Sequence, residues 1–222
     1  MNILVLILLA AMTVFMYWKY QHDVNYKTQA RSHVFNDCIS LLQQAQLSQD
    51  KAHLPVLHGV YDGYQVSLNT VEDTLGWRKI PPLWLLIKVA ANKASYGTLD
   101  FIARPANNEF YSPSWQWDGN LSTPASWPQH AIIKYQTQAV DLALLEPYVP
   151  ILFTDSKMKE LLVTTSMVRL TYMVKQAERG EYLIMRNAVY ENSPISKDAV
   201  EVLLKQAIAI RKTIENAEIE AT

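Results

Sequence analysis

The chain has 222 residues, is 50% hydrophobic and carries a formal net charge of −1. Residues 1–31 hold three Lys/Arg and one Asp, which leaves a net charge of −3 for the remainder. A weakly acidic remainder without a basic block argues against a nucleic-acid-binding surface and against broad adhesion to anionic lipid, because both need clustered Lys and Arg. The hydrophobic fraction is high enough for a packed core. Cys38 is the only cysteine, so no intrachain disulfide can form, as is typical of a reducing compartment.

An uncharged apolar run occupies the beginning of the chain, from Ile3 to Trp18 (ILVLILLAAMTVFMYW). As a helix, the stretch from Met1 to Trp18 would rise roughly 27 Å, which is close to the thickness of a bilayer core. Tyr17, Trp18 and Tyr20 lie together at its end, and amphipathic rings favour the headgroup layer. We therefore expect a single transmembrane helix over residues 1–20, followed by a juxtamembrane stalk and helix over residues 21–50.

Two other readings of this run are weaker. A cleaved signal peptide needs a positively charged start and small residues before a polar exit, whereas large apolar residues follow the pair Ala10-Ala11. A buried core helix is a weak explanation for a run at the extreme N-terminus that has no polar face at all. Lys19, Lys27 and Arg31 follow the run and no Lys or Arg precedes it. The positive-inside rule then predicts a single-pass protein of a bacterial-type inner or plasma membrane, with its soluble domain in the cytoplasm.

Residues 51–222 are expected to form one α+β domain. The pair Asp62-Gly63 separates two strand-like segments, 56–61 and 64–68, and Asp-Gly is a preferred type I′ turn pair, so a β-hairpin is predicted here. The apolar run 83–91 predicts a central strand, with 98–103 as a strand beside it. Further strands are expected at 132–137 and 167–176, the latter forming a second hairpin with 182–190 around Glu178-Arg179-Gly180.

The expected helices are spread along the chain. Apolar spacing predicts helices over 34–47 and 140–148, and Asp155 or Ser156 would cap a helix that ends near Val163. A final helix would begin at Ser193-Pro194 or at Ser196, with the apolar stripe Val200, Leu203, Leu204, Ala207, Ile208 and Ile214 and an exposed Glu201–Lys205 pair. Hairpins and helices in this order indicate an antiparallel sheet with helices packed on one face.

The Pro/Trp-rich loop over residues 104–130 is the best candidate for a binding surface. It contains four prolines, so no periodic structure is expected through it. Long loops in compact domains are uncommon unless they serve a function, and Trp and Tyr dominate binding hot spots. The predicted binding residues are Tyr111, Trp115, Trp117 and Trp127. Alternatively, the tryptophans fold back and cover the sheet, or they dip into the lipid interface near the anchor.

The sequence offers few residues for chemistry. There is no G-x-G-x-x-G and no G-x-x-x-x-G-K, which excludes the common nucleotide-binding loops. His53 and His58 would face opposite sides of a strand, and neither H-E-x-x-H nor C-x-x-C occurs, so neither a metal nor a cofactor is expected. Ser156 and Lys159 match S-x-x-K at a predicted helix start, where the lysine would activate the serine. A capping serine beside a solvated lysine is the commoner explanation of that pattern.

These observations favour a membrane-tethered, non-enzymatic interaction or scaffold domain that binds a protein partner at the membrane through Trp115 and Trp117. An envelope-facing hydrolase or transferase that uses Ser156 and Lys159 is the rival hypothesis. A small-ligand or lipid carrier is a third, and it requires a deep apolar pocket under the sheet.

Overall fold

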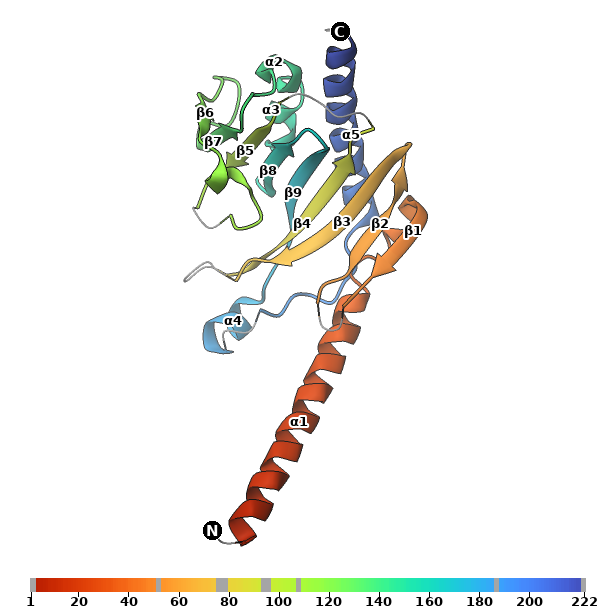
Figure 1. Cartoon of the computed structure of the whole chain (residues 1–222), viewed down its shortest axis with the longest axis vertical. Helices are drawn as coiled ribbons and strands as arrows, with labels where there is room; N and C mark the ends of the chain where they lie inside the picture. Colours follow the sequence, from red (N-terminus) through yellow and green to blue (C-terminus); the bar gives the residue numbers. More distant parts are fainter. Residues whose placement is uncertain are drawn as a thin grey trace.

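A computed structural model describes residues 3–50, 53–74, 80–92, 97–106, 109–185 and 188–220. A long helix, α1 (Ile3–Ser32), projects from a domain that is built on one antiparallel sheet (Figure 1). The sheet has nine strands in the order β1-β2-β3-β4-β9-β8-β5-β7-β6. Their bounds are β1 Gln43–Ser48, β2 Val56–Tyr61, β3 Tyr64–Glu72, β4 Pro82–Ala90, β5 Leu99–Ala103, β6 Gly119–Leu121, β7 Ala131–Tyr135, β8 Met158–Val163 and β9 Met167–Gln176. The predicted α+β class with an antiparallel sheet is confirmed.

The first hairpin forms as the turn residues predict. Asp62 and Gly63 have φ values of 49° and 78°, which a type I′ turn requires, and Tyr61 pairs directly with Tyr64. Along β3 the burial alternates, with Tyr64, Val66 and Leu68 buried. This alternation directs one face of β3 into the core.

The C-terminal helix α5 (Lys197–Glu220) covers the apolar face of β4 and β9. Its cap is Ser196, whose hydroxyl accepts from the backbone N–H of Ala199 at 3.5 Å. The predicted stripe is buried at every position: Val200, Leu203, Leu204, Ala207, Ile208 and Ile214. The Glu201–Lys205 ion pair forms at 2.8 Å on the exposed side. The short helices α2 (Leu142–Leu145) and α3 (Val149–Leu152) lie beside the same helix in Figure 1.

Helix α1 is joined to the domain by specific contacts. The chain turns after Ser32, and Phe35 and Cys38 are fully buried in the core. The Arg31 guanidinium pairs with the Glu72 carboxylate at 2.6 Å. The direction of α1 relative to the sheet is therefore fixed at its domain end.

The predicted helix over 34–47 is wrong. A 3-10 turn, η1 (Ile39–Leu41), is followed by β1, which pairs with the edge of β2. The apolar residues Val34, Phe35 and Cys38 are buried as expected, but in a turn rather than a helix. The apolar spacing correctly indicated which side chains are buried, but it did not determine the backbone conformation. The chain forms a strand here because its backbone hydrogen-bonds to the open edge of β2. The sheet thus begins at Gln43, inside the stretch predicted as stalk and helix.

The first two-thirds of α1 expose their apolar side chains. The exposed large side chains on this part are Ile3, Val5, Ile7, Leu8, Leu9, Met12, Val14, Phe15, Met16, Tyr17, Trp18 and Tyr20. Figure 1 shows this part of the helix extending away from the domain. Within the portion of the chain that the structure describes, no helix is both long enough and apolar enough to cross a membrane.

Three further predictions of strand and helix need correction. β5 is a strand, but it pairs with β8 and β7 rather than with β4, because β9 and β8 lie between them. The stretch predicted as a helix from Asp155 or Ser156 to Val163 contains strand β8 instead. The second arm of the predicted second hairpin, 182–190, is not a strand where the structure describes it: 182–185 belong to helix α4 (Arg179–Met185), 188–190 are in no strand, and 186–187 lie outside the described residues. Both edges of β9 are already occupied by β4 and β8, so a strand at 182–190 would have no partner there.

The predicted helix over 140–148 is present in part. Asp141 caps α2, its carboxylate accepting from the Ala143 N–H at 2.9 Å, and a second short helix, α3, follows. Pro150 lies in the first turn of α3, where a missing N–H costs nothing. Strand β7 confirms the strand expected near 132–137.

Candidate functional site

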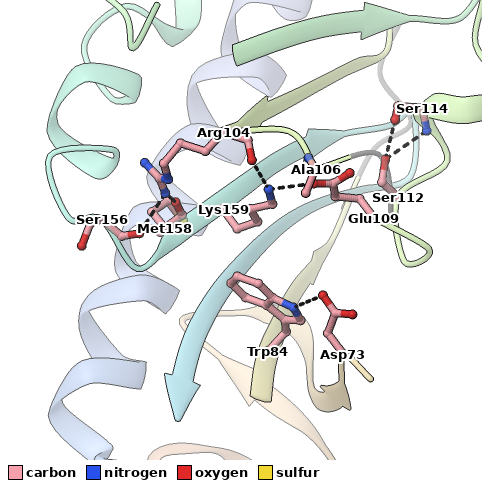
Figure 2. A network of polar contacts seen from close by, with 10 residues as sticks. All are labelled: Asp73, Trp84, Arg104, Ala106, Glu109, Ser112, Ser114, Ser156, Met158 and Lys159. Atoms are coloured by element: carbon pink, nitrogen blue, oxygen red, sulfur yellow. Dashed lines mark hydrogen bonds and ion pairs between the residues drawn. The ribbon is translucent and has the colours of Figure 1, made fainter. Parts of the chain in front are cut away.

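A cleft of about 480 Å³ lies at one end of the sheet, between the loop after β5 and helix α4. Trp84 on β4 and Met173 on β9 are paired neighbours that line it. The remaining lining residues are Asp73, Ile80, Pro81, Pro82, Arg104, Ala106, Glu109, Lys159, Gln176, Arg179 and Leu183. Three of them are cations and two are carboxylates, set beside an apolar wall. Figure 2 shows Trp84, Asp73, Lys159 and Glu109 on the side of the sheet that faces away from α5.

A β-bulge places Lys159 in this cleft. Met158 pairs with Tyr172 and Glu160 with Thr171, so Lys159 is an extra residue on β8. A bulge breaks the alternation of a strand and redirects the extra side chain. The Lys159 ammonium lies 2.7 Å from the Glu109 carboxylate and donates to the Arg104 carbonyl at 2.6 Å (Figure 2). The two side chains of this ion pair are only 9% and 8% exposed.

Glu109 is held as a carboxylate. Its burial alone would raise its pKa, but the Lys159 ammonium and the backbone N–H of Ala106 stabilise the charged form, and the pKa is lowered overall. The Ala106 N–H donates to Glu109 Oε1 at 2.7 Å. The start of the loop is thereby tied to β8.

Arg104 turns the chain out of β5. It has a φ of 51°, a left-handed conformation that is uncommon outside glycine. Its guanidinium donates to the Ser156 carbonyl at 2.8 Å and to the Met158 carbonyl at 2.5 Å. These bonds fix the Arg104 backbone so that its carbonyl meets Lys159.

A buried polar network lies under the same loop. Arg169 forms a bidentate pair with Glu160, at 2.8 Å and 3.1 Å, and Thr171 donates to Glu160 at 2.5 Å. The Ser112 hydroxyl bonds to the Asp100 carboxyl. Asp100 and Glu160 are both fully buried. This network links the loop to the face of the sheet that lies opposite α5.

The environment of Asp100 favours the neutral form of its carboxyl group. Burial raises its pKa well above the usual range, and the nearby charge of Glu160 raises it further. Its Oδ1 is buried and has no hydrogen-bond partner among the described residues unless it carries a proton. A neutral Asp100 carboxyl avoids the repulsion that a second carboxylate beside Glu160 would bring.

Aromatic rings extend the wall of the cleft toward the loop. Tyr111 lies against Trp84, with ring centroids 6.1 Å apart. The indole N–H of Trp84 donates to Asp73 at 3.4 Å. Burial, together with the charges of Glu160 and Glu109, raises the pKa of Tyr111, so the phenol remains neutral.

The structure separates the four predicted binding residues. Trp117 and Trp127 are both buried, at 6% and 2% exposure, and Trp127 belongs to the core that covers the sheet. Trp127 packs edge-on against Phe101, with centroids 5.2 Å apart, and its indole N–H donates to Glu146 at 2.6 Å. Tyr111 is half-buried beside the cleft, and only Trp115 stands out, at 72% exposure.

Ser156 and Lys159 are not arranged as an S-x-x-K site. Neither lies on a helix, and no hydrogen bond joins the Ser156 hydroxyl to Lys159, both of which are described. The Lys159 ammonium is engaged by Glu109 and Arg104 instead. Among the described residues, no group of three or more His, Cys, Asp or Glu side chains could hold a metal ion.

The sequence reading missed most residues of the cleft. Trp84, Met173 and Leu183 lie on separate elements and meet only through strand pairing and the turn into α4. One signal was available: Lys159 and Glu160 form a charged pair inside the apolar segment Met158–Val163. Charges inside such a run indicate buried partners elsewhere in the chain.

Comparisons with known proteins give no match for this chain: no family model matches it, and no curated protein or solved structure is significantly similar.

Proposed function

We propose that the protein is a membrane-tethered, non-enzymatic interaction domain that binds a protein partner at the membrane. The observation that supports the proposal is α1, whose apolar side chains are exposed along the part that extends from the domain. The uncharged run from Ile3 to Trp18 has a length close to a bilayer core, and aromatic rings lie at its end. A bilayer would remove this apolar surface from water. Tethering would also raise the effective concentration of the domain near membrane-bound partners.

The cleft, rather than the tryptophans of the loop, is the proposed partner site. Trp117 and Trp127 are buried in the domain, whereas Trp84 and Met173 line an open space. Convergent polar groups beside an apolar wall are typical of binding sites. Glu109 and Lys159 are already paired, which leaves them suited to orient a partner rather than to react.

The proposed location is a bacterial-type inner or plasma membrane with the domain in the cytoplasm. The cations Lys19, Lys27 and Arg31 after the apolar run support this orientation. Spheroplasts that express the chain with a tag after Thr222 would be treated with protease. Protection of the tag is expected, and its digestion would place the domain outside.

Site-specific photo-crosslinking in cells tests the partner site. A photoreactive residue would be placed at Met173 in the cleft and at Trp115 on the exposed loop, with Asn216 on the exposed side of α5 as control. Adducts to a membrane protein are expected from position 173 and should disappear in the Trp84→Ala variant. Adducts from 115 alone would return the site to the loop, and no protein adduct from either position would remove support for an interaction domain.

The two other hypotheses have less support. A hydrolase that uses Ser156 and Lys159 needs these groups in contact, and covalent labelling of Ser156 by an acyl-directed probe would be required to revive it. A lipid carrier needs space under the sheet, where the side chains of α5 are packed. Leu204 and Ala207 of α5 are fully buried there.

A further inference from the structure

We propose that helix α4 is a second membrane contact, which lays Leu183 and Ile184 into the interface of the bilayer that holds α1. The inference rests on the proposed tether, since it needs α1 to fix the domain at a membrane. It adds an orientation: the end of the domain that carries α4 and the cleft would face the lipid.

The exposure of α4 is the first observation. Ile184 is 80% exposed and Leu183 49%, and Ile184 is the most exposed large hydrophobic side chain among the described residues. Both side chains lie on the short helix α4, whose beginning is held by buried contacts. Ala177 and Tyr182 are buried, and the Ala177 N–H donates to the Pro81 carbonyl at 2.9 Å. The two apolar side chains are thus presented outward by a fixed element.

The position of α4 is the second observation. Figure 1 shows α4 below the sheet, at the end of the domain from which α1 projects, while the C-terminal end of α5 lies at the opposite end. The Arg31–Glu72 ion pair and the buried Phe35 fix α1 to the domain at that same end. A bilayer around the apolar part of α1 would therefore lie at the end of the domain that carries α4, where Leu183 and Ile184 are exposed.

Charge argues for an apolar rather than an electrostatic contact. Glu178, Arg179, Glu181 and Arg186 flank the exposed pair in the sequence and carry no net charge. Attraction to anionic headgroups needs clustered Lys and Arg, which this helix lacks. The contact should therefore form on neutral phosphatidylcholine and should not strengthen when phosphatidylglycerol is added.

The chain is well suited to a fluorescence test. Its only cysteine, Cys38, is buried, and burial together with Asp37 raises the pKa of the thiol to about 11, so it resists labelling. Full-length Ile184→Cys, Phe15→Cys and Asn216→Cys variants would each be labelled with NBD and placed in phosphatidylcholine vesicles. Position 15 reports the tether, position 184 the proposed contact, and position 216 water at the far end of the domain. Nitroxide lipids then show whether a blue-shifted label lies in lipid.

Blue-shifted, nitroxide-quenched emission at positions 15 and 184, with position 216 unshifted, is the expected result. If position 15 is quenched but 184 resembles 216, the second contact is overturned while the tether stands. If position 15 is not quenched, the tether itself fails. A blue shift at 184 without quenching by nitroxide lipid would mean that α4 contacts protein, which also overturns the proposal.

Discussion

The buried pair Glu160–Arg169 offers the sharpest test of the polar network under the loop. Glu160 is fully buried, and the Arg169 side chain is 7% exposed. Removing one partner of a buried pair leaves an uncompensated charge and costs about 3–5 kcal/mol. Asp100 changes this expectation, because its proton can leave once Glu160 is neutral. Glu160→Gln should then cost about 3 kcal/mol, since Asp100 supplies the missing carboxylate to Arg169.

The double variant removes that compensation. Asp100→Asn alone should leave stability at pH 7 unchanged or raise it, because an amide can donate where the neutral carboxyl does and has no proton to hold. Asp100→Asn with Glu160→Gln should cost about 5 kcal/mol, which exceeds the sum of the single changes by at least about 2 kcal/mol. Urea unfolding of the full chain in detergent micelles, followed by tryptophan fluorescence at pH 7, measures all three variants. Additive effects would refute the coupling between Asp100 and Glu160.

A partly exposed ion pair provides the matched control. Arg31 and Glu72 have side chains that are 26% and 23% exposed, so Glu72→Gln should cost about 0–1 kcal/mol. If Glu160→Gln is no more costly than Glu72→Gln, the argument from burial is wrong.

Three further predictions concern stability. Because burial and Glu160 raise the pKa of Asp100, the folded chain keeps a proton that the unfolded chain releases above about pH 4. The contribution of Asp100 to the free energy of unfolding therefore falls as pH rises through the raised pKa. Urea midpoints measured from pH 4 to pH 9 should decrease with pH, and Asp100→Asn should reduce this pH dependence. An equal pH dependence in both proteins would contradict the raised pKa of Asp100. Gly59→Ala should cost about 1–3 kcal/mol in the same assay, because its Cβ would lie 2.8 Å from Leu42 Cβ and 2.9 Å from the Gln43 carbonyl; an unchanged midpoint would show that this edge can relax. Trp127→Phe should cost about 1 kcal/mol by removing the bond to Glu146, and a neutral result would mean that water replaces it.

Local signals predicted the elements that local chemistry decides. Asp62-Gly63 defined the first hairpin, and the stripe from Val200 to Ile214 defined α5, because a turn type and a helical face are written in adjacent residues. The residue that caps α5 is Ser196, which lies three residues after the alternative cap, Ser193. Such boundaries depend on which side chain reaches a free N–H, and the sequence offers several candidates.

The remaining elements and the cleft depend on strand pairing and on a β-bulge, which the sequence pattern does not reveal. The bulge at Lys159 breaks the alternation of β8, so its apolar residues resemble a helical pattern. The segment predicted as a second arm, 182–190, overlaps α4, and both edges of β9 are already occupied by β4 and β8. The cleft depends on Trp84, Lys159 and Leu183, which are brought together only by the order of the strands and the turn into α4. No window of the sequence contains that information.

Flotation of the full chain with membranes at alkaline pH tests the tether most directly. Leu8 and Val14 are 62% and 69% exposed on α1, so Leu8→Arg with Val14→Arg should leave the domain folded while placing two charges in the apolar run. Asn25→Arg, on the polar part of the same helix, is the control. The unaltered chain and the control are expected to float with the membranes, whereas the double variant is not. An unaltered chain that stays in the soluble fraction, or a double variant that floats equally well, would contradict the proposed tether.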